Sequence, residues 1–477
     1  MALGDRKAKL LFLLLGISLV HGLIYSAVIP PWQSPDEPRH FEYVSLLCEK
    51  RRLITEKDVS PPLQRAIIAS MQEHNFWQFG RGFFNPQKPP QSFADIWGAG
   101  GPTTLLHRSP LYYLLGLPFF ALVAGKDLVT QLYTLRLLSV ILGMLTVLIA
   151  WCTARELFPD DDFMRIGVPA FIALLPMFAF MAGSVNSDNL ANLVVSLLLL
   201  LLVIVFRRGL SWPRALGILV LVAVGLATKR TTTSVIPLLL AAIPLLYVGM
   251  REEKQEKALQ VSRLGLGLAA GVVILAIVAL VVGKSGLLGG ETLKNMERTL
   301  SRYLFNYPGQ LQAILTQLSS LTVSTLFSSL QRLFTSFWAE FGWLKVRLAP
   351  LWYQVLAGVC LAALGGIFLL TFRLVRRPEL LESWQKRCLL LFALYILIVA
   401  AAPVIFFSAY LATQWEAPPQ GRYVFLGIVP IAILLMLGLR EPVPVRYRPS
   451  FLVLCLVAMV FFDFLCLTRY VIPYFYG

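Results

Sequence analysis

The sequence predicts an all-α protein that crosses a membrane about eleven times. Of its 477 residues, 57% are hydrophobic and only 14% are charged, and the mean hydropathy is +0.71. Such values are typical of polytopic membrane proteins rather than soluble enzymes. The net charge of +16 comes mostly from lysines and arginines in short loops between apolar runs. This pattern indicates orientation in a membrane rather than binding to nucleic acid.

The first predicted span runs from Leu10 to Val28. It is too long for the apolar region of a cleavable signal peptide, and small cleavage-site residues do not follow it. Three basic residues precede it, so the positive-inside rule places the N-terminus in the cytoplasm and the end of this helix at the outer face. The other expected spans are 135–155, 166–182, 189–206, 213–227, 234–250, 264–283, 350–372, 388–410, 423–439 and 450–470.

A polar region, 30–134, forms the predicted first extracytoplasmic loop of a single transmembrane domain, 1–477. Within it, the apolar run Leu111 to Ala124 is too short for a span, and we expect a half-embedded helix. If this run crossed, the basic loops that follow would all lie outside, against the positive-inside rule. For the same reason we expect the run 311–334 to lie along the outer surface as an amphipathic lid, within a second outer region, 285–349.

Directly after the first span comes a proline-rich turn with two adjacent carboxylates, Asp36 and Glu37. Prolines end the first helix, and Pro38 suits the first turn of a new one, which would place Glu37 at a positively polarised N-terminus. His40 would then lie about one turn away, within reach of the same ligand or metal. Two interpretations stay open: a capped turn that happens to carry acids, or acids held at the membrane surface for chemistry.

Several cations lie on the outer side, where the orientation rule disfavours them. Arg108 and Arg136 flank the half-embedded segment, Lys229 lies between two spans, and Arg422 precedes another span. A charge at bilayer depth costs on the order of 3 kcal/mol and is usually paired or functional. We therefore expect Lys229 and Arg422 to bind an anion such as a lipid-linked phosphate. The alternative is that such side chains reach out to lipid headgroups.

Other polar residues fall on the same face. Asp188 either caps the next helix or joins the outer site beside Asp36. His107 opens the half-embedded helix and could bind a phosphate or a sugar hydroxyl. Trp343 could stack on a sugar or anchor the lid at the interface. Asp463, an acid within the last span, is expected to pair with a neighbouring arginine.

Taken together, these stretches resemble the GT-C superfamily of membrane glycosyltransferases, and in particular a bacterial group described as predicted membrane proteins. The resemblance spans nearly the whole chain, and the order and spacing of the motifs are more specific than any one of them. The matching elements are Pro35–His40, Ser109–Tyr113, Asn186–Asp188, Thr228–Lys229, Phe337–Trp343 and Gln420–Tyr423. One departure is that the second outer loop has no DxD-type pair of metal ligands, only Asp188 with Asn186.

The resemblance implies a GT-C-like fold and transfer of a sugar, with inversion, from a polyprenyl-phosphate donor to a glycan, lipid or protein acceptor. The reaction would take place on the extracytoplasmic face of a bacterial plasma membrane. An acid of the first outer loop, Asp36 or Glu37, would serve as base or metal ligand, and our working hypothesis takes Asp36 as the base, with Glu37 positioning it or holding a cation. A divalent cation, if one is used, would have Asp36, Glu37 and His40 as candidate ligands. The expected substrate and phosphate ligands are His40, His107, Arg108, Asp188, Lys229, Arg422 and Tyr423.

Two other classes of function stay open. A transporter or flippase of lipid-linked sugars would need the phosphate site but not paired acids at one surface. Polar groups near the middle of the bilayer, in opposed spans, would favour this interpretation. An oligosaccharide ligase or polymerase with a diphosphate-linked donor would share the outer cations. Release of polyprenyl phosphate from a sugar donor would separate transfer from transport.

Overall fold

A computed structural model describes residues 2–79, 88–97, 105–106, 108–253, 323–411 and 419–477. The chain is an all-α polytopic membrane protein. Among the described residues, eight helices are long and apolar enough to cross a membrane, or nine if one bent pair is counted as a span. A further apolar helix, α11 (Trp212–Thr228), is 17 residues long. The predicted span 264–283 and the first part of the predicted lid, 311–322, lie outside the described residues.

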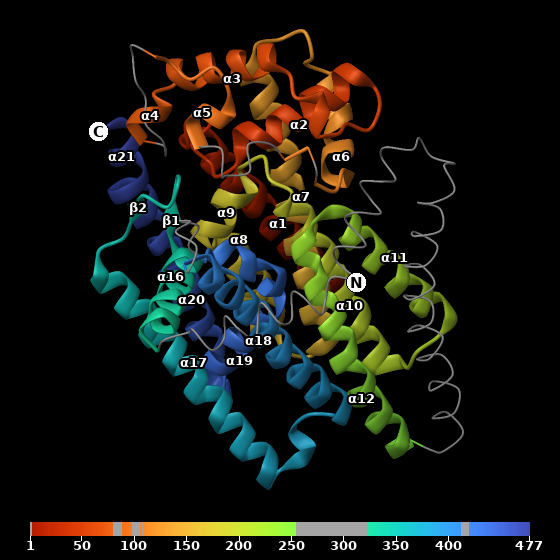
Figure 1. Cartoon of the computed structure of the whole chain (residues 1–477). Coiled ribbons are helices and arrows are strands. Elements are labelled where there is room, and N and C mark those ends of the chain that lie inside the picture. Colours follow the sequence, from red (N-terminus) through yellow and green to blue (C-terminus); the bar gives the residue numbers. More distant parts are fainter. Residues whose placement is uncertain (1, 80–87, 98–104, 107, 254–322, 412–418) are drawn as a thin grey trace.

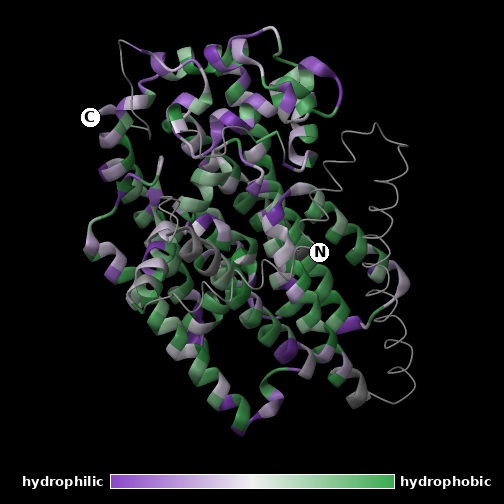
Figure 2. Ribbon diagram, in the orientation of Figure 1, coloured by the Kyte–Doolittle hydropathy of each residue, from purple (hydrophilic) through white to green (hydrophobic). Residues whose placement is uncertain are grey.

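The long helices form a bundle in which α7 contacts α1, α8 and α10, and α19 contacts α8, α17 and α18. Their apolar faces make up most of the bundle, whereas polar residues gather at one end (Figure 2). The helices of the bundle are α1 (Ala2–Val28), α7 (Leu128–Leu157), α8 (Asp162–Leu174), α9 (Pro176–Ala182), α10 (Asp188–Arg208), α12 (Val235–Glu253), α17 (Pro350–Arg376), α18 (Ser383–Leu411), α19 (Ile428–Arg440) and α20 (Arg448–Leu465).

A layer of shorter helices covers the polar end of the bundle (Figure 1). Its core packs aromatic and aliphatic side chains from the first loop against the start of α7. The C-terminal helix α21 (Ile472–Tyr476) reaches the same end, where the ring of Phe475 lies edge-on to that of Phe79, with 5.2 Å between the ring centres. The helices of this layer are α2 (Glu37–Lys50), α3 (Pro61–Glu73), α4 (Phe76–Phe79), α5 (Phe93–Trp97) and α6 (Leu111–Ala121).

The short helix α6 corresponds to the run that we expected not to cross. At 1.5 Å per residue, its 11 residues span about 16 Å, roughly half of the hydrocarbon core of a bilayer. It packs against α2 and α7. The next helix, α7, begins at Leu128, seven residues before the predicted span, because Asp127 caps it by accepting hydrogen bonds from the backbone N–H groups of Val129 and Thr130 at 3.0 and 2.9 Å.

The predicted lid continues as α16 (Val323–Trp338), which contacts α18 and leads into a two-stranded hairpin. Strand β1 (Glu340–Phe341) pairs with β2 (Val346–Arg347) in antiparallel register, with Glu340 opposite Arg347. Trp343, in the turn, is 7% exposed and donates from its indole N–H to the carbonyl oxygen of Trp32 at 3.3 Å. The indole is therefore enclosed by protein, and neither sugar stacking nor interface anchoring describes its contacts.

Two glycines let α17 and α19 approach closely. A Cβ atom on Gly366 would lie 1.8 Å from the carbonyl oxygen of Gly438, and one on Gly438 would lie 2.1 Å from the carbonyl oxygen of Ala363. Small residues at such crossings allow backbones to touch, which is how helices gain packing energy in lipid.

Candidate active site

The site begins at the proline-rich turn between α1 and α2. Asp36 adopts a left-handed backbone conformation, with φ of 67° and ψ of −2°, which aspartate tolerates better than most residues. Its carbonyl oxygen accepts hydrogen bonds from the N–H groups of Arg39 and His40, both at 3.1 Å, and these bonds start α2. The predicted helix start near Pro38 is therefore confirmed, with Glu37 as the first helical residue.

Two arginines hold the Asp36 carboxylate. Arg39, one turn along α2, bonds Oδ1, and Arg422 donates from Nη2 to Oδ2 at 2.9 Å. Burial alone would raise the pKa of Asp36, but the charges of Arg39, Arg422 and Arg108 outweigh it and hold the pKa well below its usual value. The low pKa keeps the carboxylate ionised, and because 18% of the side chain is exposed it is still reachable.

Arg422 is placed by a close backbone contact. It lies in a 3-10 segment, η4 (Gly421–Gly427), that leads into α19. A Cβ atom on Gly421 would lie 2.1 Å from the backbone nitrogen of Phe337 in α16, and the Gly421 N–H donates to Ser336 Oγ at 2.8 Å. The guanidinium of Arg422 lies over the Tyr423 ring, 5.3 Å from its centre. A glycine is therefore required where α16 crosses this segment.

A second ion pair joins Lys229 to Asp188. The Lys229 Nζ atom lies 2.5 Å from Asp188 Oδ1, and the two side chains are 8% and 4% exposed. Lys229 is extended, with φ of −159°, where α11 ends, and Asp188 is the first residue of α10. Burial lowers the pKa of Lys229 to about 8, with Arg108 and Arg422 lowering it further and Asp188 opposing them. The ammonium group is therefore close to titrating at neutral pH.

His40 interacts electrostatically with members of both ion pairs. Its Nδ1 atom is 2.9 Å from the hydroxyl of Tyr113, which comes from α6. Burial lowers the pKa of His40 well below its usual value; Asp36 opposes this, whereas Arg108, Lys229 and Arg39 add to it. The imidazole is therefore neutral and can exchange hydrogen bonds without changing the charge of the site.

The cluster is positively charged and offers donors that the protein does not use. Four cations, Arg39, Arg108, Lys229 and Arg422, face two carboxylates. Within the part of the chain that the structure describes, Nε and Nη1 of Arg422 are buried without hydrogen-bond partners, as is Nε2 of His40. Buried polar atoms of this kind, donors on Arg422 and a ring nitrogen of His40 whose role depends on its tautomer, are costly unless a ligand or water completes them. A tetrahedral, doubly charged anion such as a phosphate ester would satisfy both the charge and the donors.

Asn186 and Asp188 add unpaired groups beside the donors. Among the described residues, Asn186 Nδ2 and Asp188 Oδ2 are buried without partners, while Asn186 Oδ1 accepts the backbone N–H of Asp188 at 2.9 Å. One further donor and one acceptor therefore face the same region, as hydroxyl groups of a sugar would need.

Glu37 lies apart from this cluster despite being next to Asp36. It forms a fully buried bidentate pair with Arg136 of α7, at 2.9 and 2.6 Å. Arg136 also donates to the carbonyl oxygens of Ser26, Ile29 and Pro30, at 2.7, 2.8 and 3.2 Å. The pair clamps the turn that carries Asp36, and the hydrogen bonds leave little room for another role.

Of the other expected ligands, Arg108 and Tyr423 lie in the cluster and His107 lies outside the described residues. The three candidate metal ligands do not converge, because Asp36 faces arginines and Glu37 faces Arg136. In the described ranges, no group of three or more His, Cys, Asp or Glu side chains has a geometry that could hold a metal ion. Arg39 was missed, although its position one turn after Asp36 within the same motif could have indicated it.

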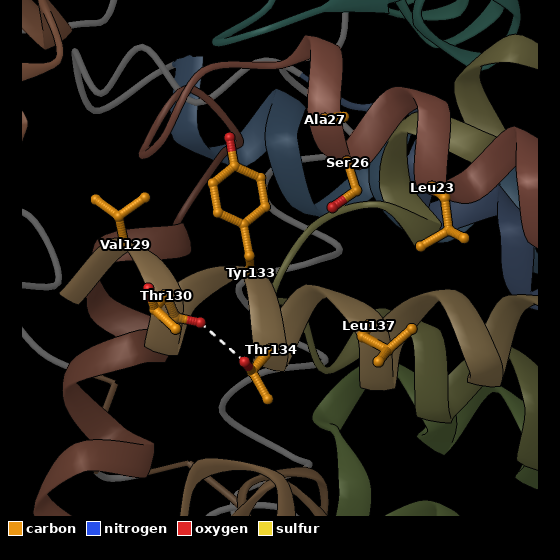
Figure 3. Close-up of a pocket in the computed structure, with 8 residues that line it drawn as sticks. All are labelled: Leu23, Ser26, Ala27, Val129, Thr130, Tyr133, Thr134 and Leu137. Carbon is orange, nitrogen blue, oxygen red and sulfur yellow. Dashed lines mark hydrogen bonds between the residues drawn. The ribbon is translucent and has the colours of Figure 1, made fainter. Parts of the chain in front are cut away.

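A groove of about 570 Å³ lies on the other side of the clamp, between α1 and α7 (Figure 3). It is lined mostly by apolar atoms of Leu23, Ala27, Val129 and Leu137, with the Tyr133 ring at one end. Ser26, whose carbonyl oxygen is bound by Arg136, also lines it. The groove is therefore separate from Asp36 and does not enlarge the charged cluster.

Comparison with protein families gives one match. A family model described as a predicted membrane protein (DUF2142) matches residues 19–435. No curated protein matches the sequence.

Three solved structures share a similar arrangement at low identity. The oligosaccharyltransferase of Archaeoglobus fulgidus in its apo form is 12% identical, with a TM-score of 0.49 over 96% of this chain and 55% of that one. AglB of the same organism, in complex with an inhibitory peptide and a dolichol-phosphate, is 14% identical, with a TM-score of 0.47 over 95% and 55%. ArnT of Cupriavidus metallidurans, bound to undecaprenyl phosphate, is 14% identical, with a TM-score of 0.45 over 97% and 73%. The chain thus spans about half the length of the archaeal enzymes.

Proposed function

This chain belongs to the DUF2142 family of predicted membrane proteins, and we propose that it is a GT-C-like glycosyltransferase that uses a polyprenyl-phosphate sugar. The observation that carries this proposal is the meeting of Asp36, Arg422, Lys229 and His40 in one buried, positively charged cluster. The positive-inside rule places this end of the bundle on the extracytoplasmic side. The acceptor is a hydroxyl-bearing glycan, lipid or protein.

The cations serve the phosphate of the donor. Arg422 offers three N–H groups, on two nitrogens that have no hydrogen-bond partner among the described residues, and Lys229 adds a point charge beside it. Both stabilise the negative charge that develops on the phosphate as the glycosidic bond breaks, and they do so in a setting that excludes much of the water. The polyprenyl tail lies among the membrane helices.

Asp36 serves as the base. The acceptor oxygen attacks the anomeric carbon, its proton passes to Asp36 Oδ2, and the electron pair of the broken bond leaves with the phosphate. A single displacement of this kind inverts the configuration at the anomeric carbon. Asp36 gains basicity when the phosphate takes Arg422 away from Oδ2, because that guanidinium helps to hold its pKa low. Glu37 acts only through the turn, by fixing it to Arg136.

The test is release of polyprenyl phosphate from a polyprenyl-phosphate sugar by the purified chain. Asp36→Asn is the sharpest variant, because asparagine tolerates the same left-handed backbone while removing the base. We expect turnover to fall by about 10²- to 10⁴-fold, the usual contribution of a general base. Asp95→Asn, at an exposed carboxylate that caps α5 in the same layer, is the matched control and should keep full activity.

Turnover of Asp36→Asn within tenfold of the parent would remove Asp36 from the role of base. Movement of the donor across vesicles without release of polyprenyl phosphate would instead favour the transporter. Release from a diphosphate-linked donor but not from a monophosphate one would favour the ligase or polymerase.

A further inference from the structure

A second polar cluster lies inside the membrane bundle, between α1 and α20. Asp463 Oδ1 is 2.9 Å from His21 Nε2 and also accepts a hydrogen bond from the Tyr25 hydroxyl at 2.9 Å. The side chains of His21 and Asp463 are 6% and 16% exposed. We expected an arginine beside Asp463, and the structure corrects this, because a histidine and a tyrosine of the first helix contact the carboxylate instead. Ionisable side chains at this depth are usually functional.

The contact of the other ring nitrogen of His21, Nδ1, shows that this nitrogen carries a hydrogen. Nδ1 lies 2.7 Å from the carbonyl oxygen of Ala173. A carbonyl oxygen can only accept, so Nδ1 must carry a hydrogen. This carbonyl is open to a side chain because the chain bends by 61° between α8 and α9, at Pro176. The break thus orients the imidazole.

Counting protons at the other nitrogen leads to the inference. With hydrogen on Nδ1, a neutral His21 presents a lone pair at Nε2. That lone pair would face Asp463 Oδ1, which is itself an acceptor when the carboxylate is ionised. Two acceptors 2.9 Å apart repel each other, so the contact requires one more proton between them, as imidazolium or as carboxylic acid.

We propose that His21, Tyr25 and Asp463 form a proton-binding site inside the membrane domain that clamps α1 to α20. The further titratable group beside it is the thiol of Cys466, one turn after Asp463. A π-helical segment, η6 (Cys466–Val471), starts there, and such segments occur frequently at functional sites. This site is independent of the proposed transfer reaction and shares no residue with it.

The proton-binding site also contacts the hairpin of β1 and β2. The Tyr25 ring stacks on Phe341 of β1, with 5.7 Å between ring centres. The hairpin that begins with β1 in turn contacts the proline-rich turn through Trp343 and Trp32. Loss of the proton would set two acceptors against each other at the base of this chain of contacts.

The test is the protonation of His21 in the full chain in lipid nanodiscs, measured by ¹⁵N NMR on labelled histidine at pH 8.5. The sequence has four histidines, which keeps the spectrum simple. We expect His21 to show hydrogen on both ring nitrogens, or on Nδ1 alone together with the infrared band of a protonated carboxyl. His74 is the internal comparison, since its Nδ1 also lies on a backbone carbonyl, at 2.8 Å from Ser70, and no described carboxylate pairs with its Nε2.

Asp463→Asn is the matched variant, because its amide can donate to Nε2 and needs no extra proton. It should lose the second N–H resonance of His21, or the carboxyl band, and leave His74 unchanged. If the variant does not fold, the parent spectrum decides alone. A His21 ring with bare Nε2 and no protonated carboxyl at pH 8.5 overturns the proposal.

Discussion

Replacing Arg136 by methionine would leave the Glu37 carboxylate buried with a single hydrogen bond, from the backbone N–H of Val185 at 3.1 Å. Both partners are fully buried, and Arg136 makes five hydrogen bonds to Glu37 and to three carbonyl oxygens of the turn. Removing one partner of a buried pair costs about 3–5 kcal/mol, because the other charge stays uncompensated. Arg136→Met should therefore lower the free energy of unfolding by at least that amount.

Titration with sodium dodecyl sulfate from a mild detergent, followed by tryptophan fluorescence, would measure this loss. Arg207→Met is the control, since Arg207 pairs with Glu156 at 3.1 Å near the opposite end of the bundle with 37% of its side chain exposed. Exposed pairs contribute about 1 kcal/mol or less. The double variant with Glu37→Met should lose less than the sum of the single variants. Equal losses of unfolding free energy in Arg136→Met and Arg207→Met would refute the view that the buried pair of Glu37 and Arg136 stabilises the turn.

Two pH dependences follow from the structure. Burial raises the pKa of Glu42 from 4.5 to about 7, although its hydrogen bond from Gln64 acts in the opposite direction. Between these two pH values the folded state binds a proton that the unfolded state has lost, so the free energy of unfolding should fall by about 3 kcal/mol as pH rises from 4.5 to 7. Glu42→Gln should flatten this slope. Because the pKa of Lys229 is about 8, its charge is present below that pH and lost above it. In the transfer assay, kcat/KM for the donor should fall by up to about tenfold per pH unit above 8, and Lys229→Arg should move that fall to higher pH; an unchanged profile would exclude the amine from donor binding.

Hydropathy and charge placement predicted most of the bundle because both reflect the transfer of single residues into lipid, which does not depend on how the helices pack against one another. The same logic singled out Lys229 and Arg422, and the structure sets Arg422 against Asp36 and Lys229 against Asp188. Their role in binding a donor stays a prediction. They could be predicted because a cation on the disfavoured side of the membrane needs a negatively charged partner, and the fold has to supply one.

The sequence could not separate Asp36 from Glu37. The two carboxylates are adjacent, and helix-start rules favour acids at both positions. What separates them is the left-handed backbone at Asp36, which turns the two side chains toward different helices. The role of Arg136 was left open between anion binding and contact with lipid headgroups, because its partner lies 99 positions earlier in the chain. Pairings between distant segments depend on tertiary packing, which no local pattern records.

The close crossing of α17 and α19 at two glycines influences the position of Arg422, which lies far along the chain from it. Gly438 and Arg422 are sixteen positions apart, or about 24 Å along a helical rod. Any side chain at Gly366 or Gly438 would force the two backbones apart, since an added Cβ would lie 1.8 or 2.1 Å from a carbonyl oxygen. A tilt of a few degrees at that depth becomes a displacement of an ångström or more at the guanidinium. The distance between Arg422 and Asp36 thus depends on the absence of a Cβ atom at Gly366 and at Gly438, near the opposite end of the bundle.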